Sequence, residues 1–152
     1  AIFDRPDGSP WSRPPAFRSG GAGLVSTAHD FLAFARAILD DGKGAGRLLA
    51  PESVARMTRD HLTAAQKAAS PFAPGFWETA GWGLGVAVWT RALPPARKPG
   101  RWGWFGGLGT AFFVDPNEEL VGIVLTQDAM TSPMPPPVVE DFIRLAHETS
   151  LG

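Results

Sequence analysis

The sequence contains no cysteine in its 152 residues. Disulfide frameworks, thiolate zinc sites and cysteine nucleophiles are therefore all excluded. Tyrosine is absent as well, although the chain carries 6 tryptophans and 10 phenylalanines. The aromatic surface that these residues provide is consequently poor in hydroxyl groups.

An excess of charge of either sign is also missing. Lysine and arginine number 14, aspartate and glutamate 15, and the formal net charge at pH 7 is -1. A chain with so balanced a charge has no field that attracts nucleic acid or an anionic membrane. No apolar run approaches the roughly 20 residues that a membrane-spanning helix needs. We therefore expect neither a nucleic-acid partner nor a membrane span.

The length and composition suit one domain. At 152 residues with 44% hydrophobic residues, the chain can bury a real core. Its 18 glycines and 15 prolines predict many loops. The chain starts at Ala1 with no methionine and no basic segment leading into an apolar one, and we expect this start to be a cut end.

A first helix is expected after a proline- and glycine-rich loop over residues 1–23. Thr27 can cap this helix, and Asp30, three positions later, can return the hydrogen bond and favour the positive end of the dipole. Apolar residues at three- and four-residue steps extend the helix to about residue 41, where Gly42 ends it.

A second, short helix is predicted to start at Pro51 and to stop near His61. Residues 66–81 are expected to form a loop, because two prolines and a glycine interrupt any periodicity. This loop and helical part of the domain covers residues 1–81.

Residues 82–152 are expected to hold antiparallel strands and a carboxy-terminal helix. Short runs rich in aromatic or branched residues predict strands at residues 84–89, 101–106, 110–114 and 120–127. The turn sequence at residues 115–117 should join the last two strands as a hairpin. An amphipathic helix follows the prolines at 135–137 and should cover one face of the sheet. The predicted fold class is α+β.

The chain contains no complete catalytic site with a serine nucleophile and its base. No serine lies three residues before a lysine, and the nucleophile elbow Gly-x-Ser-x-Gly is absent. The histidines, His29, His61 and His147, belong to separate helices or helix ends and are expected to be exposed. Without a His-x-x-x-His pair they predict no metal site, and no motif indicates a cofactor.

Residues 100–110 combine five glycines with three large aromatic residues in a predicted strand and turn. Glycine inside a strand often indicates a place where a ligand must approach the backbone closely. A tight hairpin turn beside aromatic core residues explains the same pattern, and spacing alone leaves both explanations open.

Three stretches together resemble the family of class C β-lactamases, D-alanyl-D-alanine carboxypeptidases and family VIII esterases. Residues 20–30 are similar to its Gly-Gly-Leu-x-Ser-Thr-x-x-Asp segment, and residues 48–54 to its Leu-Leu-Ser-Pro-Glu-Ser-Val segment. Residues 103–116 are similar to the strand with its third catalytic motif, and residues 122–127 to the run that follows. In this order the stretches span nearly the whole chain.

The resemblance implies an α/β-sandwich part of the β-lactamase fold and a site on this strand. Trp104, Phe105 and Gly106 occupy the place of the family's Lys-Thr-Gly motif and would contact substrate. Gly107 would offer a backbone N–H to the oxyanion hole. Tryptophan and phenylalanine cannot bind a substrate carboxylate as lysine and threonine do, which favours a neutral ester or amide.

The family's Ser-x-x-Lys and Tyr-x-Asn motifs precede the matched region and are absent from this sequence. We therefore expect the carboxy-terminal half of a serine hydrolase, acting on a small-molecule ester or amide together with the amino-terminal half of the same protein. The alternative is a noncatalytic domain that binds an apolar ligand or a partner protein in an aromatic groove.

Overall fold

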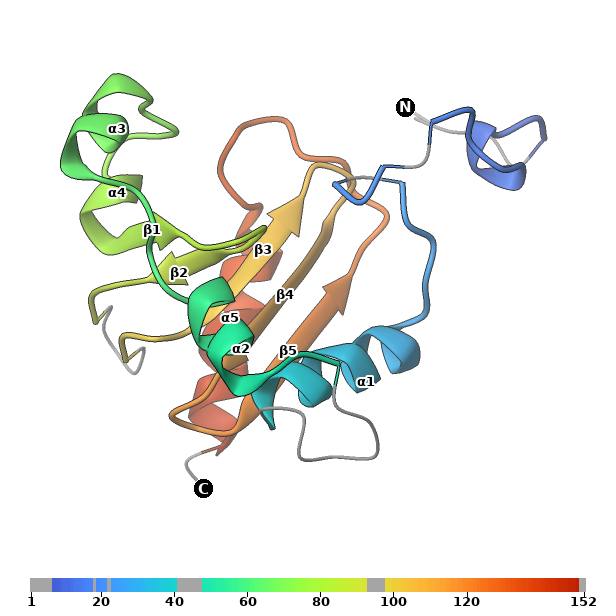
Figure 1. The fold of residues 1–152 in the computed structure, drawn as a ribbon. Coiled ribbons are helices and arrows are strands. Elements are labelled where there is room, and N and C mark those ends of the chain that lie inside the picture. The colour runs from blue at the N-terminus through green and yellow to red at the C-terminus, as the bar shows by residue number, and fades with distance from the viewer. Residues whose placement is uncertain (1–6, 18, 22, 41–47, 93–97, 151–152) are drawn as a thin grey trace.

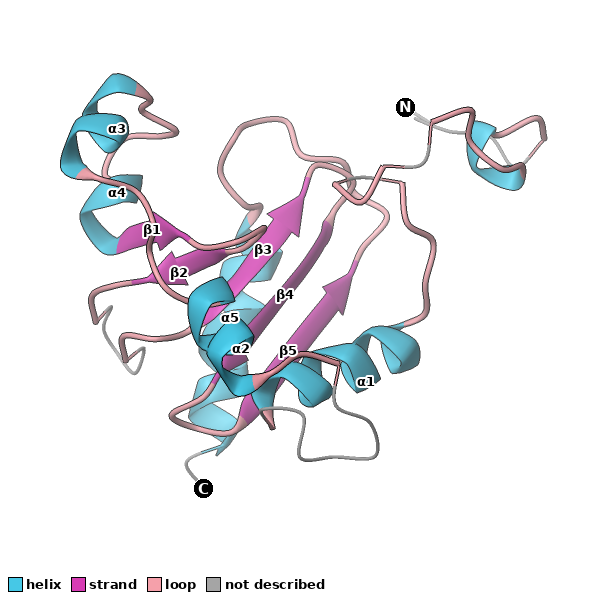
Figure 2. Cartoon of the chain, viewed as in Figure 1, coloured by secondary structure: helices cyan, strands magenta, loops and turns pink. Residues whose placement is uncertain are grey.

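The computed structural model describes residues 7–17, 19–21, 23–40, 48–92 and 98–150. Figure 1 shows the course of the chain and Figure 2 its helices and strands. In chain order the elements are η1 (Pro10–Ser12), α1 (Ala28–Leu39), α2 (Pro51–Met57), α3 (Ala64–Ala69), α4 (Phe76–Thr79), β1 (Ala80–Trp82), β2 (Ala87–Trp89), β3 (Trp102–Gly106), β4 (Thr110–Asp115), β5 (Leu120–Leu125) and α5 (Pro137–Ser150).

The five strands form one antiparallel sheet in the order β1-β2-β3-β4-β5. Strands β4 and β5 make the predicted hairpin. Asp115 Oδ1 accepts hydrogen bonds from the backbone N–H of Asn117 at 2.9 Å and from its side-chain amide at 3.1 Å. The side chain of Asp115 thus fixes the turn in which the sequence places proline.

Helices lie on both faces of the sheet, with α1 and α2 in front and α5 behind in the view of Figure 1. Side chains alternate along β4, so Val114 joins one core and Phe113 the other. The front core contains Ile38 of α1, and the rear core contains Ile143 of α5. This arrangement confirms the α+β fold class and the covering role of the carboxy-terminal helix.

The start of α1 follows the predicted capping chemistry. Thr27 Oγ1 accepts a hydrogen bond from the backbone N–H of Asp30 at 3.1 Å. The return contact differs from the prediction, because the Thr27 hydroxyl donates to Asp30 Oδ2 at 2.9 Å. Gly42, the predicted end of this helix, lies outside the described residues, and α1 ends at Leu39.

The prediction of a loop over residues 66–81 was wrong. Thr63 and Gln66 form a capping box that starts α3, and Gly75, with a φ of 75°, precedes α4. Strand β1 then pairs with β2 and extends the sheet by one strand. Two smaller predictions also fail, since α2 stops before His61 and β2 is confined to Ala87–Trp89.

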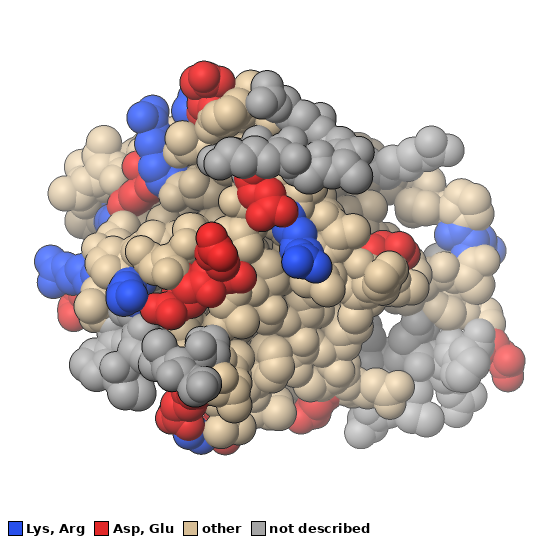
Figure 3. All heavy atoms as spheres, turned by 90° about the horizontal axis from the view of Figure 1, so that it is seen from below, with Lys and Arg blue, Asp and Glu red and all other residues tan. Residues whose placement is uncertain are grey.

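None of the helices in the described ranges is both long and apolar enough to cross a membrane. On the face shown in Figure 3, lysine and arginine side chains alternate with aspartate and glutamate side chains. No patch of a single sign dominates that face, which agrees with the balanced charge of the sequence.

Candidate substrate-binding site

The end of β3 has one open edge. Strand β2 pairs with β3 at Trp102 and Gly103. Among the described residues, 104–106 therefore pair with β4 alone. An open strand edge presents backbone donors and acceptors to whatever lies beside it. The predicted motif residues Trp104, Phe105 and Gly106 form this edge.

Gly107 follows directly and has an exposed backbone. Its carbonyl oxygen accepts a hydrogen bond of 2.9 Å from the N–H of Met130, which holds the peptide between Gly107 and Leu108. The N–H of Gly107 donates to no acceptor in the described parts of the chain. A Cβ atom added at Gly107 would meet nothing within 4 Å. Packing therefore gives no reason for glycine at this position.

Other glycines of the same segment have structural reasons. A Cβ atom at Gly103 would collide with the carbonyl oxygen of Phe112 and with Cα of Phe113. Gly109 has a φ of +84° and lies against Asp128. Its N–H donates to the carbonyl of Gly106 at 3.0 Å in the β3–β4 turn. Turn and packing thus explain part of the glycine pattern, and Gly107 is the exception.

An aromatic wall stands beside this edge. The ring of Trp104 stacks on Phe105 with centroids 4.5 Å apart and an interplanar angle of 19°. Trp82 of β1 meets Trp104 edge-on at 4.6 Å, and Phe72 lies 5.5 Å away. Such tilted and offset pairs are favourable ring geometries. The wall therefore has a fixed shape.

Trp104, Phe105 and Phe72 line a cleft of about 1000 Å³, here called the main cleft. It is bounded by residues 104–108 of the strand and turn, residues 130–133 after β5, Phe72, Trp11 and a segment around Leu24. All four predicted site residues, Trp104, Phe105, Gly106 and Gly107, lie on it. None of its described lining residues is aspartate, glutamate, lysine, arginine or histidine.

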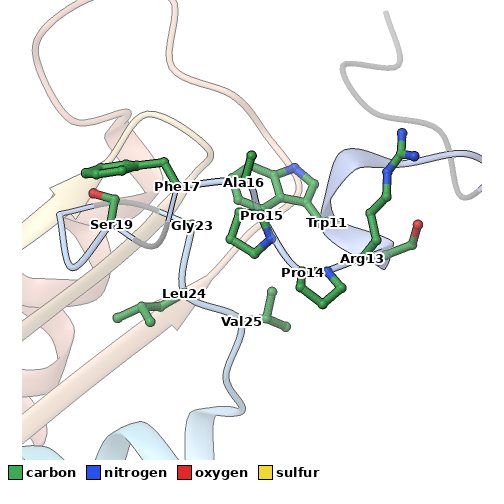
Figure 4. Close-up of a pocket in the computed structure, with 11 residues that line it drawn as sticks. Trp11, Arg13, Pro14, Pro15, Ala16, Phe17, Ser19, Gly23, Leu24 and Val25 are labelled. Atoms are coloured by element: carbon green, nitrogen blue, oxygen red, sulfur yellow. The ribbon is translucent and has the colours of Figure 1, made fainter.

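A second hollow adjoins the main cleft on the amino-terminal segment (Figure 4). Trp11, Leu24 and Val25 line both hollows, so the two are continuous along this segment. Arg13 is its one charged lining residue, and its side chain extends away from Leu24 and Val25 in Figure 4. Sequence reasoning treated this segment as loop and missed its part in the cleft.

The hydroxyl groups of the main cleft have no base beside them. Ser26 Oγ donates to the carbonyl of Thr27 at 3.3 Å, and Ser132 Oγ to that of Met134 at 3.3 Å. A serine nucleophile needs an adjacent group that takes its proton. The described lining residues contain no amine, imidazole or carboxylate that could do so.

The histidines lie away from the main cleft. His29 and His61 are exposed, as expected. The expectation for His147 was wrong, because its side chain is buried on α5 and packs against Phe113 with ring centroids 5.1 Å apart. Within the described ranges, no group of three or more histidine and acidic side chains could hold a metal ion.

Two curated proteins that are similar in sequence are longer than this chain. Two curated proteins of Mycobacterium tuberculosis, the uncharacterized protein MT1414 (strain CDC 1551 / Oshkosh) and protein Rv1367c (strain ATCC 25618 / H37Rv), are each 40% identical over 128 residues. The match covers 79% of this chain and 31% of each relative. The chain thus spans about a third of their length.

Solved structures share the fold. EstCE1, a hydrolase with promiscuous acyltransferase activity, is 24% identical with a TM-score of 0.66, over 100% of this chain and 39% of EstCE1. Unliganded simvastatin synthase LovD from Aspergillus terreus is 21% identical with a TM-score of 0.66, over 88% and 37% of the two chains. At these identities the likeness establishes the fold.

The sequence profile of the Beta-lactamase family matches residues 2–146. The predicted resemblance to the carboxy-terminal part of the serine β-lactamase-related hydrolases is therefore confirmed. The chain belongs to the Beta-lactamase family and has the fold of its hydrolases and acyltransferases.

Proposed function

We propose that the chain forms one side of the substrate cleft of a serine hydrolase that cleaves esters through an acyl-enzyme. The nucleophile and its base are carried by a segment outside these 152 residues. Trp104, Phe105 and Gly106 contact the substrate, and the N–H of Gly107 stabilises the oxyanion of the tetrahedral intermediate.

The backbone of Gly107 is the observation that supports this proposal. Its N–H has no acceptor in the described chain. The peptide that carries this N–H joins Gly106 to Gly107, and its carbonyl oxygen is held by the 3.0 Å hydrogen bond from the N–H of Gly109. A donor that is already oriented and unoccupied suits an oxyanion, since stabilisation then costs no rearrangement during the reaction. The absence of a side chain at Gly107 leaves room for a substrate carbonyl to approach.

The lining of the main cleft favours neutral esters. A buried carboxylate needs a cationic or hydrogen-bonding partner, or its desolvation penalty is not offset. The described lining residues provide no cation. Esters are favoured over amides because the alcohol or phenol of an ester is a better leaving group than the amine of an amide, which must be protonated before it leaves.

A fusion protein tests the proposal. This chain replaces the matched segment of protein Rv1367c, one of the two relatives with 40% identity, so that the product has the full length of that relative. We expect the fusion to hydrolyse 4-nitrophenyl acetate and to be labelled by a fluorophosphonate at one serine outside this chain, as located by mass spectrometry. EstCE1 is the positive control of the assay.

A folded fusion that is neither labelled nor active would contradict the proposed function. If that fusion still bound uncharged aromatic compounds in a thermal-shift assay, the noncatalytic alternative would replace it. Labelling at Ser26 or Ser132 would instead show that the nucleophile had been assigned to the wrong segment.

A further inference from the structure

Phe72 reaches the main cleft from outside the sheet. It lies in the segment between α3 and α4, yet its ring centroid is 5.5 Å from that of Trp104 on β3 and 4.9 Å from that of Phe76. Its side chain is nevertheless 38% exposed. One face of the ring is thus held by other aromatic rings while another part of its surface lines the cleft.

The segment that carries Phe72 is closed by its own hydrogen bonds. Trp77 Nε1 donates to the carbonyl of Ser70 at 2.8 Å, which joins the two ends of the segment. The N–H of Phe76 donates to the carbonyl of Ala73 at 3.1 Å. An aromatic side chain that is fixed before binding loses little conformational entropy when a ligand contacts it.

A second tie holds α3 to the sheet. Lys67 Nζ donates to Asp60 Oδ2 at 2.6 Å and to the carbonyl of Ala80 at 3.2 Å. Because Ala80 begins β1, this contact connects the segment to the edge of the sheet. Phe72 is therefore positioned relative to Trp104 from both ends of its segment.

We propose that Phe72 is a specificity-determining residue. It selects esters with a bulky, uncharged apolar group, aromatic or alicyclic, over acetates of small alcohols and over esters that carry a carboxylate. This inference rests on the proposed function and adds the substrate class. The selected group belongs to the acyl part or to the alcohol part of the ester, and the two arms of the experiment distinguish them.

The aromatic wall accounts for this preference for esters with a bulky, uncharged apolar group. Trp104, Phe105 and Phe72 offer ring faces and edges that gain from contact with another flat or bulky apolar group. A methyl group reaches too little of this surface to gain from it. A carboxylate placed there would lose its water without finding a cation among the described lining residues.

The experiment compares Phe72→Ala with the unchanged fusion protein on two pairs of esters. The acyl pair is 4-nitrophenyl acetate and 4-nitrophenyl cyclohexanecarboxylate, and the alcohol pair is ethyl acetate and benzyl acetate. We expect Phe72→Ala to lower the bulky-to-small ratio of kcat/KM about tenfold in one pair, mainly through KM, because ground-state contact is lost. We also expect 4-carboxybenzyl acetate to react at least tenfold more slowly than benzyl acetate.

Two further variants separate specificity from stability. Phe34→Ala removes a phenylalanine of similar exposure, 42%, from α1 and outside the main cleft, and should leave both ratios unchanged. Phe72→Leu preserves apolar bulk, so the bulky-to-small ratio of kcat/KM can be measured on it even if the alanine variant unfolds. We expect its ratio to lie between those of Phe72→Ala and the unchanged fusion.

Ratios that stay within twofold of the unchanged fusion in both pairs, for Phe72→Ala and Phe72→Leu alike, would overturn the role of Phe72. So would equal rates for the neutral and carboxylate-bearing benzyl esters. These outcomes differ from failure of the proposed function, in which the fusion is not labelled by the fluorophosphonate at all.

Discussion

His147 of α5 and Asp115 of β4 face each other inside the protein, with 3.1 Å between Nε2 and Oδ2. Their side chains are 2% and 0% exposed. His147 Nδ1 lies 2.7 Å from the carbonyl oxygen of Ile143, so it carries a hydrogen, because a carbonyl can only accept. The pair joins the rear helix to the end of β4, where Asp115 also holds the hairpin turn.

Replacing His147 should destabilise this attachment. We expect His147→Phe to lower the free energy of unfolding by about 3 kcal/mol, since removing one partner leaves a buried carboxylate without its pair. Urea denaturation of the fusion protein measures the loss. Arg144→Gln on the same helix breaks only exposed ion pairs, which water and salt screen, and should cost much less than His147→Phe. Equal losses for the two variants would contradict the assigned role.

The carboxyl group of Asp60 should make a contribution to stability that depends on pH. Burial acts to raise its pKa, but hydrogen bonds from Lys67 and from the backbone N–H groups of Leu62 and Trp82 outweigh burial, so the pKa lies below the usual 3.8. A carboxyl with a lowered pKa in the folded protein contributes stability above its unfolded pKa and loses it as the pH falls through the folded value.

Asp60→Asn should therefore cost about 2 kcal/mol at pH 7, the usual value of a charged hydrogen bond. The difference from the unchanged protein should shrink as the pH is lowered below about 4, where unpaired aspartate becomes protonated. Urea denaturation at pH 7, 5 and 3.5 provides the comparison. A difference that is constant over this range would show that the ionised form of Asp60 is not what stabilises the fold.

Gly107 should tolerate one substitution and not another. Gly107→Pro removes the N–H that the proposed mechanism uses, and we expect kcat of the fusion protein to fall by about 10²–10³, as when an oxyanion donor is lost. Gly107→Ala retains the N–H, and its methyl group meets no protein atom, so only crowding of the substrate carbonyl should lower its kcat, by no more than about tenfold. Comparable kcat values for both variants would exclude the backbone donor.

An alanine at Gly103 should lower the stability of the fold, whereas an alanine at Gly107 should not. A methyl group at Gly103 collides with Phe112 and Phe113, so we expect Gly103→Ala to cost about 1–3 kcal/mol. Gly107→Ala should be nearly neutral in the same thermal-unfolding measurement. An equally neutral Gly103→Ala would contradict the close contact between β3 and β4 at this point.

Local rules predicted much of the fold. The cap of α1 at Thr27 and the β4–β5 hairpin depend on neighbouring residues alone, and both are found as predicted. Strand β1 was missed because its three residues gain stability from pairing with β2 and from Asp60, which lies against Gly81. Such contacts across the chain leave no local periodicity.

Other misses had a signal in the sequence. Thr63 and Gln66 have the spacing of a capping box and could have indicated α3. His147 lies four and eight residues after Ile143 and Val139, on the buried stripe of α5, which could have indicated its burial. The family resemblance located the strand with Trp104 and Gly107, but Phe72 reaches the main cleft only through the tertiary fold.

Strand β5 has a consequence for handling the protein. Helices α1 and α5 contact β5, but only β4 pairs with it among the described residues, so one edge of the strand is unpaired. Its six residues, LVGIVL, contain no charge and no proline, the features that normally discourage strand addition. Expressed alone, the chain is thus prone to aggregate edge to edge through β5, and its solubility depends on what this strand is joined to.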